Sequence, residues 1–102
     1  MTAGPLFLMI HGAWLDSSSW DDWCDRYETA GYECVAPEWP QEQAGLGIVE
    51  IVDHYESLIR AQDREVVLIG HSFGGLFVQM LLDRGVGASG VAIDSAPPKG
   101  VT

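Results

Sequence analysis

Residues 65–76 read Glu-Val-Val-Leu-Ile-Gly-His-Ser-Phe-Gly-Gly-Leu, and this stretch decides the fold. Residues 65–69 form a mainly apolar run of strand length, and the residues after the glycines have the apolar pattern of a buried helix. Between them, Gly70 and Gly74 flank Ser72 at a spacing that leaves room for a sharp strand-to-helix turn. The stretch therefore predicts a buried strand, a tight turn that presents Ser72, and a helix.

The rest of the chain repeats this alternation of strand and helix. Apolar stripes at helical spacing lie between the strand-length runs, with Asp16 as a candidate N-cap of the first helix. This alternation is typical of parallel strands joined by right-handed crossovers. We expect an α/β fold, a three-layer parallel sheet of four strands with three helices, as a single domain over residues 1–102. The further strands are expected at 6–10, 32–36 and 90–93, and the helices at 20–31, 47–61 and 76–84.

Composition excludes several classes of protein. Of the 102 residues, 47% are apolar, which argues against disorder. The formal charge of −10 disfavours binding to nucleic acid or to anionic membranes. No apolar stretch approaches the roughly 18 residues of a membrane span, and the run 5–10 lacks the flanks of a signal peptide. We therefore expect a cytoplasmic protein without nucleic-acid or membrane partners.

Cys24 and Cys34 do not have the spacing of a metal site. We expect them to be free thiols buried as small apolar side chains, with a disulfide or a reactive thiol as the alternative. The glycine-rich turn lacks both the lysine of a P-loop and the glycine spacing of a dinucleotide fingerprint. The sequence therefore predicts neither a metal nor a cofactor.

The first strand ends in His11-Gly12-Ala13-Trp14. Gly12 allows the chain to leave the strand abruptly, so the Ala13 amide is a candidate oxyanion donor. The Phe73 amide, at the start of the third helix, is the second candidate. The alternative is that both segments are ordinary glycine-rich turns and that Ser72 is incidental.

These motifs together resemble the α/β-hydrolase fold superfamily, and in particular a bacterial group of uncharacterised α/β hydrolases. The matching segments are residues 11–14, 30–32, 52–55, 70–76 and 92–97. The resemblance implies a serine nucleophile at Ser72 and an oxyanion hole formed by the Ala13 and Phe73 amides. It also implies that this chain corresponds to the N-terminal portion of such a domain, without the later strands and the loop that carries the triad histidine.

No histidine follows Ser72 in the sequence. His11 lies in the predicted oxyanion turn, His71 is expected to point away from the serine, and His54 lies within a helix, so none of them is expected to act as the general base. Asp94 ends the fourth strand and is either the acid of the triad or a turn residue.

We expect an esterase-like serine hydrolase acting on a small-molecule carboxylic ester, or a fragment of one, with Trp14, Trp39 and His71 lining the substrate pocket. The alternative is a non-catalytic module that binds a ligand or a partner. Without later strands, the fourth strand is an open edge, and we expect a homodimer through this edge or through the exposed face of the sheet.

Overall fold

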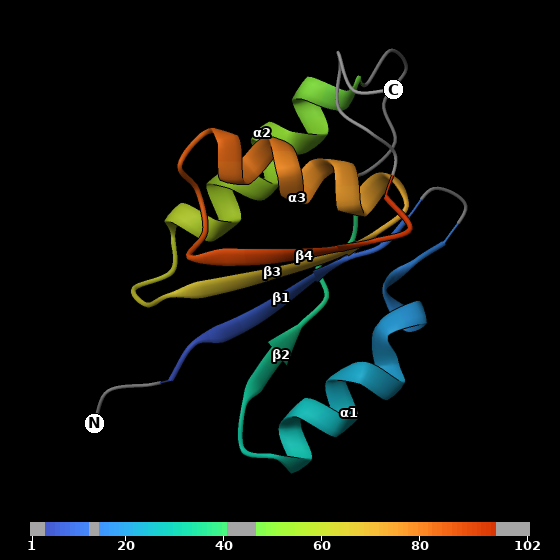
Figure 1. Cartoon of the computed structure of the whole chain (residues 1–102), viewed down its shortest axis with the longest axis vertical. Coiled ribbons are helices and arrows are strands. Elements are labelled where there is room, and N and C mark those ends of the chain that lie inside the picture. The colour runs from blue at the N-terminus through green and yellow to red at the C-terminus, as the bar shows by residue number, and fades with distance from the viewer. Residues whose placement is uncertain (1–3, 13–14, 41–46, 96–102) are drawn as a thin grey trace.

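The computed structural model describes residues 4–12, 15–40 and 47–95. Its four strands form one parallel sheet in the order β2-β1-β3-β4, and three α-helices pack against it (Figure 1). The predicted fold is therefore confirmed. The elements are β1 (Leu6–Ile10), the short 3-10 helix η1 (Ser17–Trp20), α1 (Asp21–Thr29), β2 (Glu33–Val35), α2 (Ile48–Arg60), β3 (Val66–His71), α3 (Phe73–Asp83) and β4 (Ser89–Ile93).

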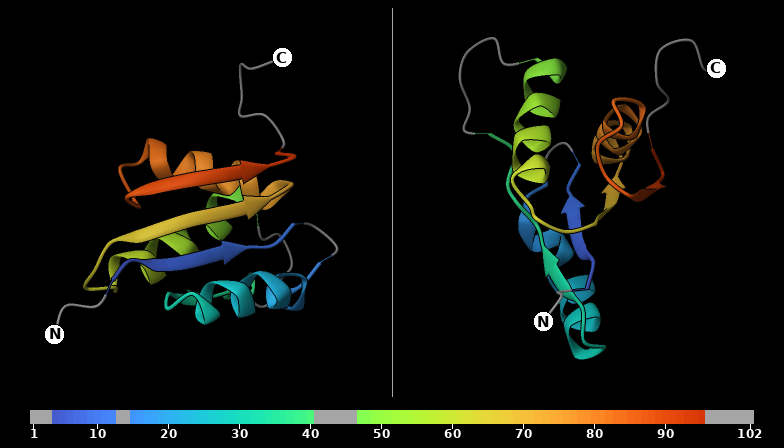
Figure 2. Two further views of the ribbon diagram at one scale, coloured as in Figure 1. Left: turned by 60° about the horizontal axis from the view of Figure 1, so that its bottom comes forward. Right: turned by 90° about the vertical axis from the view of Figure 1, so that its left-hand side faces the viewer.

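The sheet is the middle of three layers. Helices α2 and α3 lie on one face and α1 lies on the other (Figure 2). Because side chains alternate along a strand, Leu8 and Ile10 of β1 pack with α2 and α3, whereas Met9 packs with Trp20 on the side of α1. Both faces of β1 are thus buried, as its continuous apolar sequence predicts.

Strand β4 departs from the expectation that every strand is covered on both faces. Gly90 lies against α3, where an added Cβ would stand 2.6 Å from a methyl carbon of Val78. Val91, on the opposite face, is 51% exposed. The reason is that α1 covers the β1–β2 side of that face, and no other helix in the described ranges covers β4 there (Figure 2).

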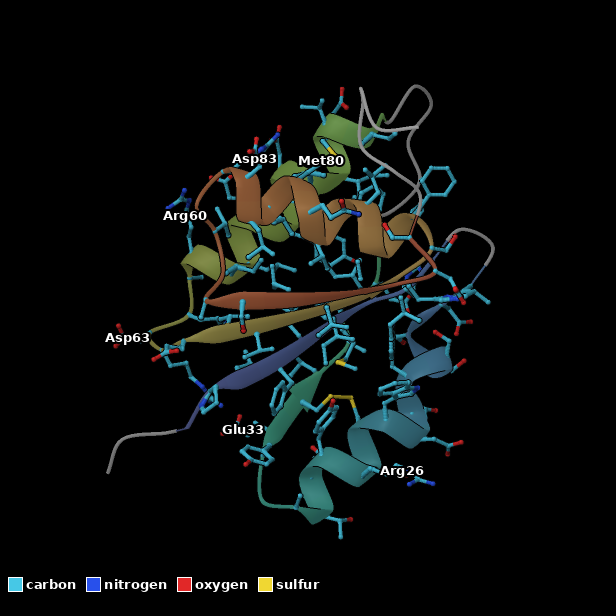
Figure 3. All side chains as sticks on the ribbon, in the orientation of Figure 1. Arg26, Glu33, Arg60, Asp63, Met80 and Asp83 are labelled. Carbon is cyan, nitrogen blue, oxygen red and sulfur yellow. A yellow bond between two sulfur atoms is a disulfide. The ribbon has the colours of Figure 1, made fainter. Side chains whose placement is uncertain are left out.

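The expectation of two free buried thiols is wrong. Cys24 on α1 and Cys34 on β2 form a disulfide, with their Cα atoms 5.2 Å apart (Figure 3). The two residues meet because α1 packs directly on β2 and both side chains face that interface. The bond ties the outermost helix to the outermost strand on this side of the molecule.

The sequence predicted that the third helix begins after Gly75, whereas α3 begins at Phe73. The reversal of chain direction needs only one residue, Ser72, so the two glycines that follow already belong to the helix. Across the parts of the chain that the structure describes, no helix combines the length and apolar character needed to cross a membrane.

Candidate active site

Ser72 occupies a strained position between β3 and α3. Its backbone angles are φ 59° and ψ −122°, a conformation with positive φ that residues other than glycine seldom adopt. The carbonyl oxygen of Ser72 accepts hydrogen bonds from the amides of Gly75, at 2.9 Å, and Leu76, at 3.2 Å. The serine therefore lies in neither a strand nor a helix, and a tight turn presents it at the carboxyl edge of the sheet.

The glycines on both sides of Ser72 are required by close packing. A Cβ on Gly70 would stand 2.2 Å from the carbonyl oxygen of Gly74. A Cβ on Gly74 would stand 2.1 Å from the carbonyl oxygen of Ile10, at the end of β1. No side chain fits at either distance, so the Gly-x-Ser-x-Gly spacing reflects a real steric need.

Gly12 brings the turn after β1 against Ser72. A Cβ on Gly12 would lie 3.0 Å from Cβ of Ser72 and 3.0 Å from the carbonyl oxygen of His71. The two turns that the sequence analysis singled out are therefore in contact. Ala13 and Trp14 lie outside the described residues, so their predicted roles as oxyanion donor and pocket residue stay predictions.

The Ser72 hydroxyl and the amide that follows it are not engaged by other described groups. Among the described residues, the Ser72 hydroxyl and the Phe73 amide have no hydrogen-bond partner. An unpaired amide is expected in the first turn of a helix, where the positive end of the helix dipole also favours an anion. The Phe73 N–H is thus available as an oxyanion donor, although its predicted role is not tested.

Asp94 follows the strand next to the serine. The amide of Ser72 donates to the carbonyl oxygen of Ile93 at 3.0 Å, which places the end of β4 beside the turn. Asp94 itself is exposed, has φ 45° and makes no hydrogen bond or ion pair to any described residue. Aspartate tolerates this left-handed conformation, so a turn role accounts for Asp94, and its role as the triad acid stays a prediction.

The side chain of His11 acts as a structural brace between two loops. It is only 4% exposed, its Nδ1 lies 2.9 Å from the carbonyl oxygen of Gly12, and its Nε2 lies 3.4 Å from the amide of Trp39. Its Nε2 also lies 3.5 Å from a carboxylate oxygen of Glu38. His11 therefore holds the end of β1 to the segment that follows β2.

Trp39 belongs to a row of aromatic rings that leads to the turn. Its indole N–H donates to the carbonyl oxygen of His11 at 2.9 Å, and the two rings stack with centroids 5.2 Å apart. Trp39 also packs on Phe77 in a T-shaped arrangement with ring centroids 5.2 Å apart, and Phe77 stacks on the 39% exposed Phe73 with centroids 6.5 Å apart. Trp39 is thus fixed beside the site, and its predicted contact with substrate is untested.

His71 lies on the face of the sheet that carries α1. It lines a hollow of about 300 Å³ whose other walls are Leu15, Ser19, Trp20, Trp23 and Ile93. The role of His71 in substrate binding, which would require this hollow to receive part of the substrate, stays a prediction.

None of the three histidines hydrogen-bonds to Ser72. His11 is engaged with the loop after β2, His71 faces the hollow, and His54 lies in the middle of α2 with its ring beside Tyr55. The described residues also contain no cluster of three or more His, Cys, Asp or Glu side chains that could hold a metal ion.

Sequence reasoning missed the contacts that fix the segment after β2. The Tyr55 hydroxyl donates to the carbonyl oxygen of Pro37 at 2.9 Å, and burial raises the pKa of this phenol well above its usual value. The Ser17 amide donates to Glu38 at 2.8 Å, and hydrogen bonding from Ser17 lowers the pKa of that carboxyl. These partners lie 18 and 21 residues apart, and no local pattern signals them.

Comparison with known proteins identifies the family. Residues 7–102 match the sequence profile described as the alpha/beta hydrolase family. The chain belongs to the alpha/beta hydrolase family. No curated protein matches the sequence significantly.

Solved structures of alpha/beta hydrolases share the fold. The chain superposes on an extracellular alpha/beta-hydrolase from a Paenibacillus species with a TM-score of 0.79 at 25% identity, covering 92% of this chain and 42% of that one. That protein is described as sharing structural and functional homology with tobacco salicylic acid binding protein 2. A monoacylglycerol lipase from Paleococcus ferrophilus gives a TM-score of 0.79 at 22% identity, with coverage of 95% and 42%.

A pyrethroid hydrolase from Sphingobium faniae JZ-2 gives a TM-score of 0.74 at 20% identity, covering 98% of this chain and 44% of that one. At such identities the likeness to the lipase and to the pyrethroid hydrolase shows the fold alone. This alpha/beta hydrolase chain spans less than half the length of the solved structures that it matches.

Proposed function

We propose that this chain carries the nucleophile of a serine hydrolase that acts on carboxylic esters. The observation that carries the proposal is the strained backbone of Ser72, at φ 59°, in contact with the turn at Gly12. Strain of about 1–3 kcal/mol at a residue without a buried or hydrogen-bonded side chain calls for a functional explanation. Membership in the alpha/beta hydrolase family supports the same conclusion.

In the proposed reaction, Oγ of Ser72 attacks the carbonyl carbon of the ester and loses its proton to a general base. The resulting oxyanion is held by the amides of Phe73 and Ala13. Collapse of the tetrahedral intermediate releases the alcohol, which takes up the proton, and leaves an acyl group on Ser72. Water then hydrolyses this acyl-enzyme and restores the serine.

The general base is proposed to come from polypeptide that this chain does not contain. None of the three histidines hydrogen-bonds to Ser72, and the solved structures are more than twice as long as the part that this chain matches. A serine hydroxyl without a base is a weak nucleophile. We therefore expect the isolated chain to react slowly with activated esters and to turn them over poorly.

The aromatic row beside the turn favours an ester with an apolar substituent. Phe73 is 39% exposed next to Ser72 and Trp39 is partly exposed, while the buried ring of Phe77 packs against both of them. Trp14 and His71 are proposed to complete the pocket. A small uncharged ester suits this surface, since apolar walls with few polar groups are typical of small-molecule sites.

The test is covalent labelling with a fluorophosphonate, followed by intact mass and peptide mapping. We expect one adduct on Ser72, which is lost in Ser72→Ala and kept in the control Ser57→Ala, an exposed serine on α2. Free imidazole should speed acylation by p-nitrophenyl acetate in the wild type beyond the rate in Ser72→Ala, because it replaces the absent base. Labelling no faster than in Ser72→Ala, in a folded protein, would refute the proposal.

The second candidate is a non-catalytic module that uses the same fold to bind a ligand or a partner. The observation that favours it is that the Ser72 hydroxyl has no hydrogen-bond partner among the described residues. A folded chain whose serine resists both labelling and imidazole rescue would select this alternative.

A further inference from the structure

The carbonyl group of Gly12, in the turn that contacts Ser72, is held by two donors. Its oxygen accepts a hydrogen bond from Nδ1 of the buried His11 ring at 2.9 Å. The Leu15 amide donates to the same oxygen at 3.3 Å. A buried side chain and a backbone group therefore fix the direction in which this carbonyl points.

This carbonyl and the amide of the next residue belong to one peptide unit. A trans peptide unit is planar, so its C=O and its N–H point in opposite directions. A contact that fixes the carbonyl of Gly12 therefore also fixes the direction of the amide that follows it. That amide belongs to Ala13, the second of the two proposed oxyanion donors.

Glu38 connects the His11 ring to the start of η1. One oxygen of its carboxylate accepts from the Ser17 amide at 2.8 Å, and the other lies 3.5 Å from Nε2 of His11. Glu38 thus contacts the chain on both sides of the turn after β1, although it lies 21 residues from Ser17 in the sequence. The same side chain restrains the segment that enters the turn and the segment that leaves it.

The loop that carries Glu38 is itself fixed to the body of the protein. The hydroxyl of the buried Tyr55 donates to the carbonyl oxygen of Pro37 at 2.9 Å, and the indole N–H of Trp39 donates to the carbonyl oxygen of His11 at 2.9 Å. The side chain of Glu38 lies between these two anchored residues and is 51% exposed. A substitution of Glu38 is therefore compatible with the fold.

We propose that His11 and Glu38 are positioning residues for the oxyanion hole, an inference that rests on the proposed function. His11 orients the peptide unit after Gly12, and Glu38 holds the His11 ring and the start of η1 in place. Both act through the amide of Ala13 and neither contacts the substrate. Loss of Glu38 should therefore slow the chemical step and leave the affinity for the reagent unchanged, because the oxyanion forms only when the nucleophile attacks.

The test separates the two parameters of fluorophosphonate labelling at Ser72, the affinity KI and the maximal rate kinact. Glu38→Ala should change KI by less than about twofold and lower kinact by about tenfold, since complete loss of an oxyanion donor costs roughly 10²–10³ in rate. Glu38→Gln should recover most of the rate, because its amide oxygen can accept from Ser17 and its NH₂ group can reach Nε2 of His11. Glu28→Ala is the matched control, since the exposed Glu28 side chain on α1 makes no hydrogen bond or ion pair to any described residue, and it should match the wild type.

Hydrogen exchange of the Ser17 amide, measured by NMR, tests the contact separately from reactivity. This amide should exchange faster in Glu38→Ala than in the wild type, because it loses its acceptor, and Glu38→Gln should restore its protection. Faster exchange with an unchanged kinact would show that Glu38 is only structural and would overturn the proposal, as would unchanged exchange in a folded Glu38→Ala. A wild type that is not labelled at Ser72 would overturn the proposed function and this proposal with it, whereas equal kinact in a labelled wild type and in Glu38→Ala would overturn this proposal alone.

Discussion

Cβ of Ser72 lies 3.0 Å from the position that a Cβ on Gly12 would occupy, so the turn after β1 and the turn after β3 touch at the candidate nucleophile. Gly12 also lies 3.0 Å, by the same measure, from the carbonyl oxygen of His71. Two turns that are 60 residues apart in the sequence therefore contact each other, and a methyl group added at Gly12 would disturb both.

Replacing Gly12 by alanine should slow labelling of Ser72. The added methyl forces the serine or the turn to shift, at a cost of about 1–3 kcal/mol in stability. We expect the rate of fluorophosphonate labelling to fall at least tenfold, measured by mass spectrometry, while circular dichroism shows a retained fold. Gly4→Ala is the control, because nothing lies within 4 Å of its added Cβ. Equal labelling rates in the two variants would contradict the assigned contact.

Loss of the Cys24–Cys34 disulfide should destabilise the chain. The bridged residues are ten apart, and a loop of this length corresponds to about 3 kcal/mol of stability in the chain-entropy account. We expect denaturant unfolding of the wild type to move to lower concentration in dithiothreitol and to match the double variant Cys24→Ser/Cys34→Ser. The double variant itself should not respond to the reductant. A wild type that is insensitive to reductant would show that the thiols are free.

The ion pairs between α2 and the end of α3 should make stability depend on pH. Arg84 lies 2.7 Å from Asp53 and 2.9 Å from Glu56, and hydrogen bonds from Arg60 and then Arg84 hold the pKa of Glu56 below its usual value. A lowered pKa in the folded state stabilises the protein at neutral pH, and this contribution is lost as the pH falls through that lowered pKa.

Glu56→Gln should therefore lower the melting temperature at pH 7 by no more than a few degrees, because the pairs are solvent-exposed. The difference from the wild type should shrink as the pH falls below about 4. Asp63→Asn is the control, since Asp63 is an exposed carboxylate without an ion pair to any described residue. A deficit in Glu56→Gln that is as large in acid as at pH 7 would rule out this linkage.

Local signals were sufficient to predict the sheet and the position of Ser72. Residues 66–69 are apolar because β3 is buried on both faces, and the glycines around Ser72 mark contacts that no side chain could occupy. The bounds of β1 were predicted to the residue, and those of the other elements to within a few residues.

What the sequence could not predict are contacts between distant residues. Cys24 and Cys34 were expected to be free, because their spacing alone does not reveal that α1 packs on β2. The brace between His11 and Trp39 joins two loops 28 residues apart and has no local signature. Strand β4 is partly exposed because no described helix covers its second face, and the apolar character of residues 90–93 does not reveal this.

The cytoplasmic location expected from the sequence stays a prediction. Disulfides are uncommon in reducing compartments. The redox state of Cys24 and Cys34 in cells therefore bears on the compartment in which the protein resides. Alkylation of intact cells before lysis, followed by mass spectrometry of the two cysteines, would show their state where the protein resides.

The placement of Gly74 against the carbonyl oxygens of Ile10 and His11 has a consequence for strand alignment. Sliding β1 by a single residue along β3 would displace Gly12 from Ser72 by about 3.3 Å. It would also place other backbone atoms of β1 against the first turn of α3. The tight turn therefore fits only one register of β1 against β3. Folding intermediates with a wrong register are therefore destabilised at the same turn that carries the proposed nucleophile.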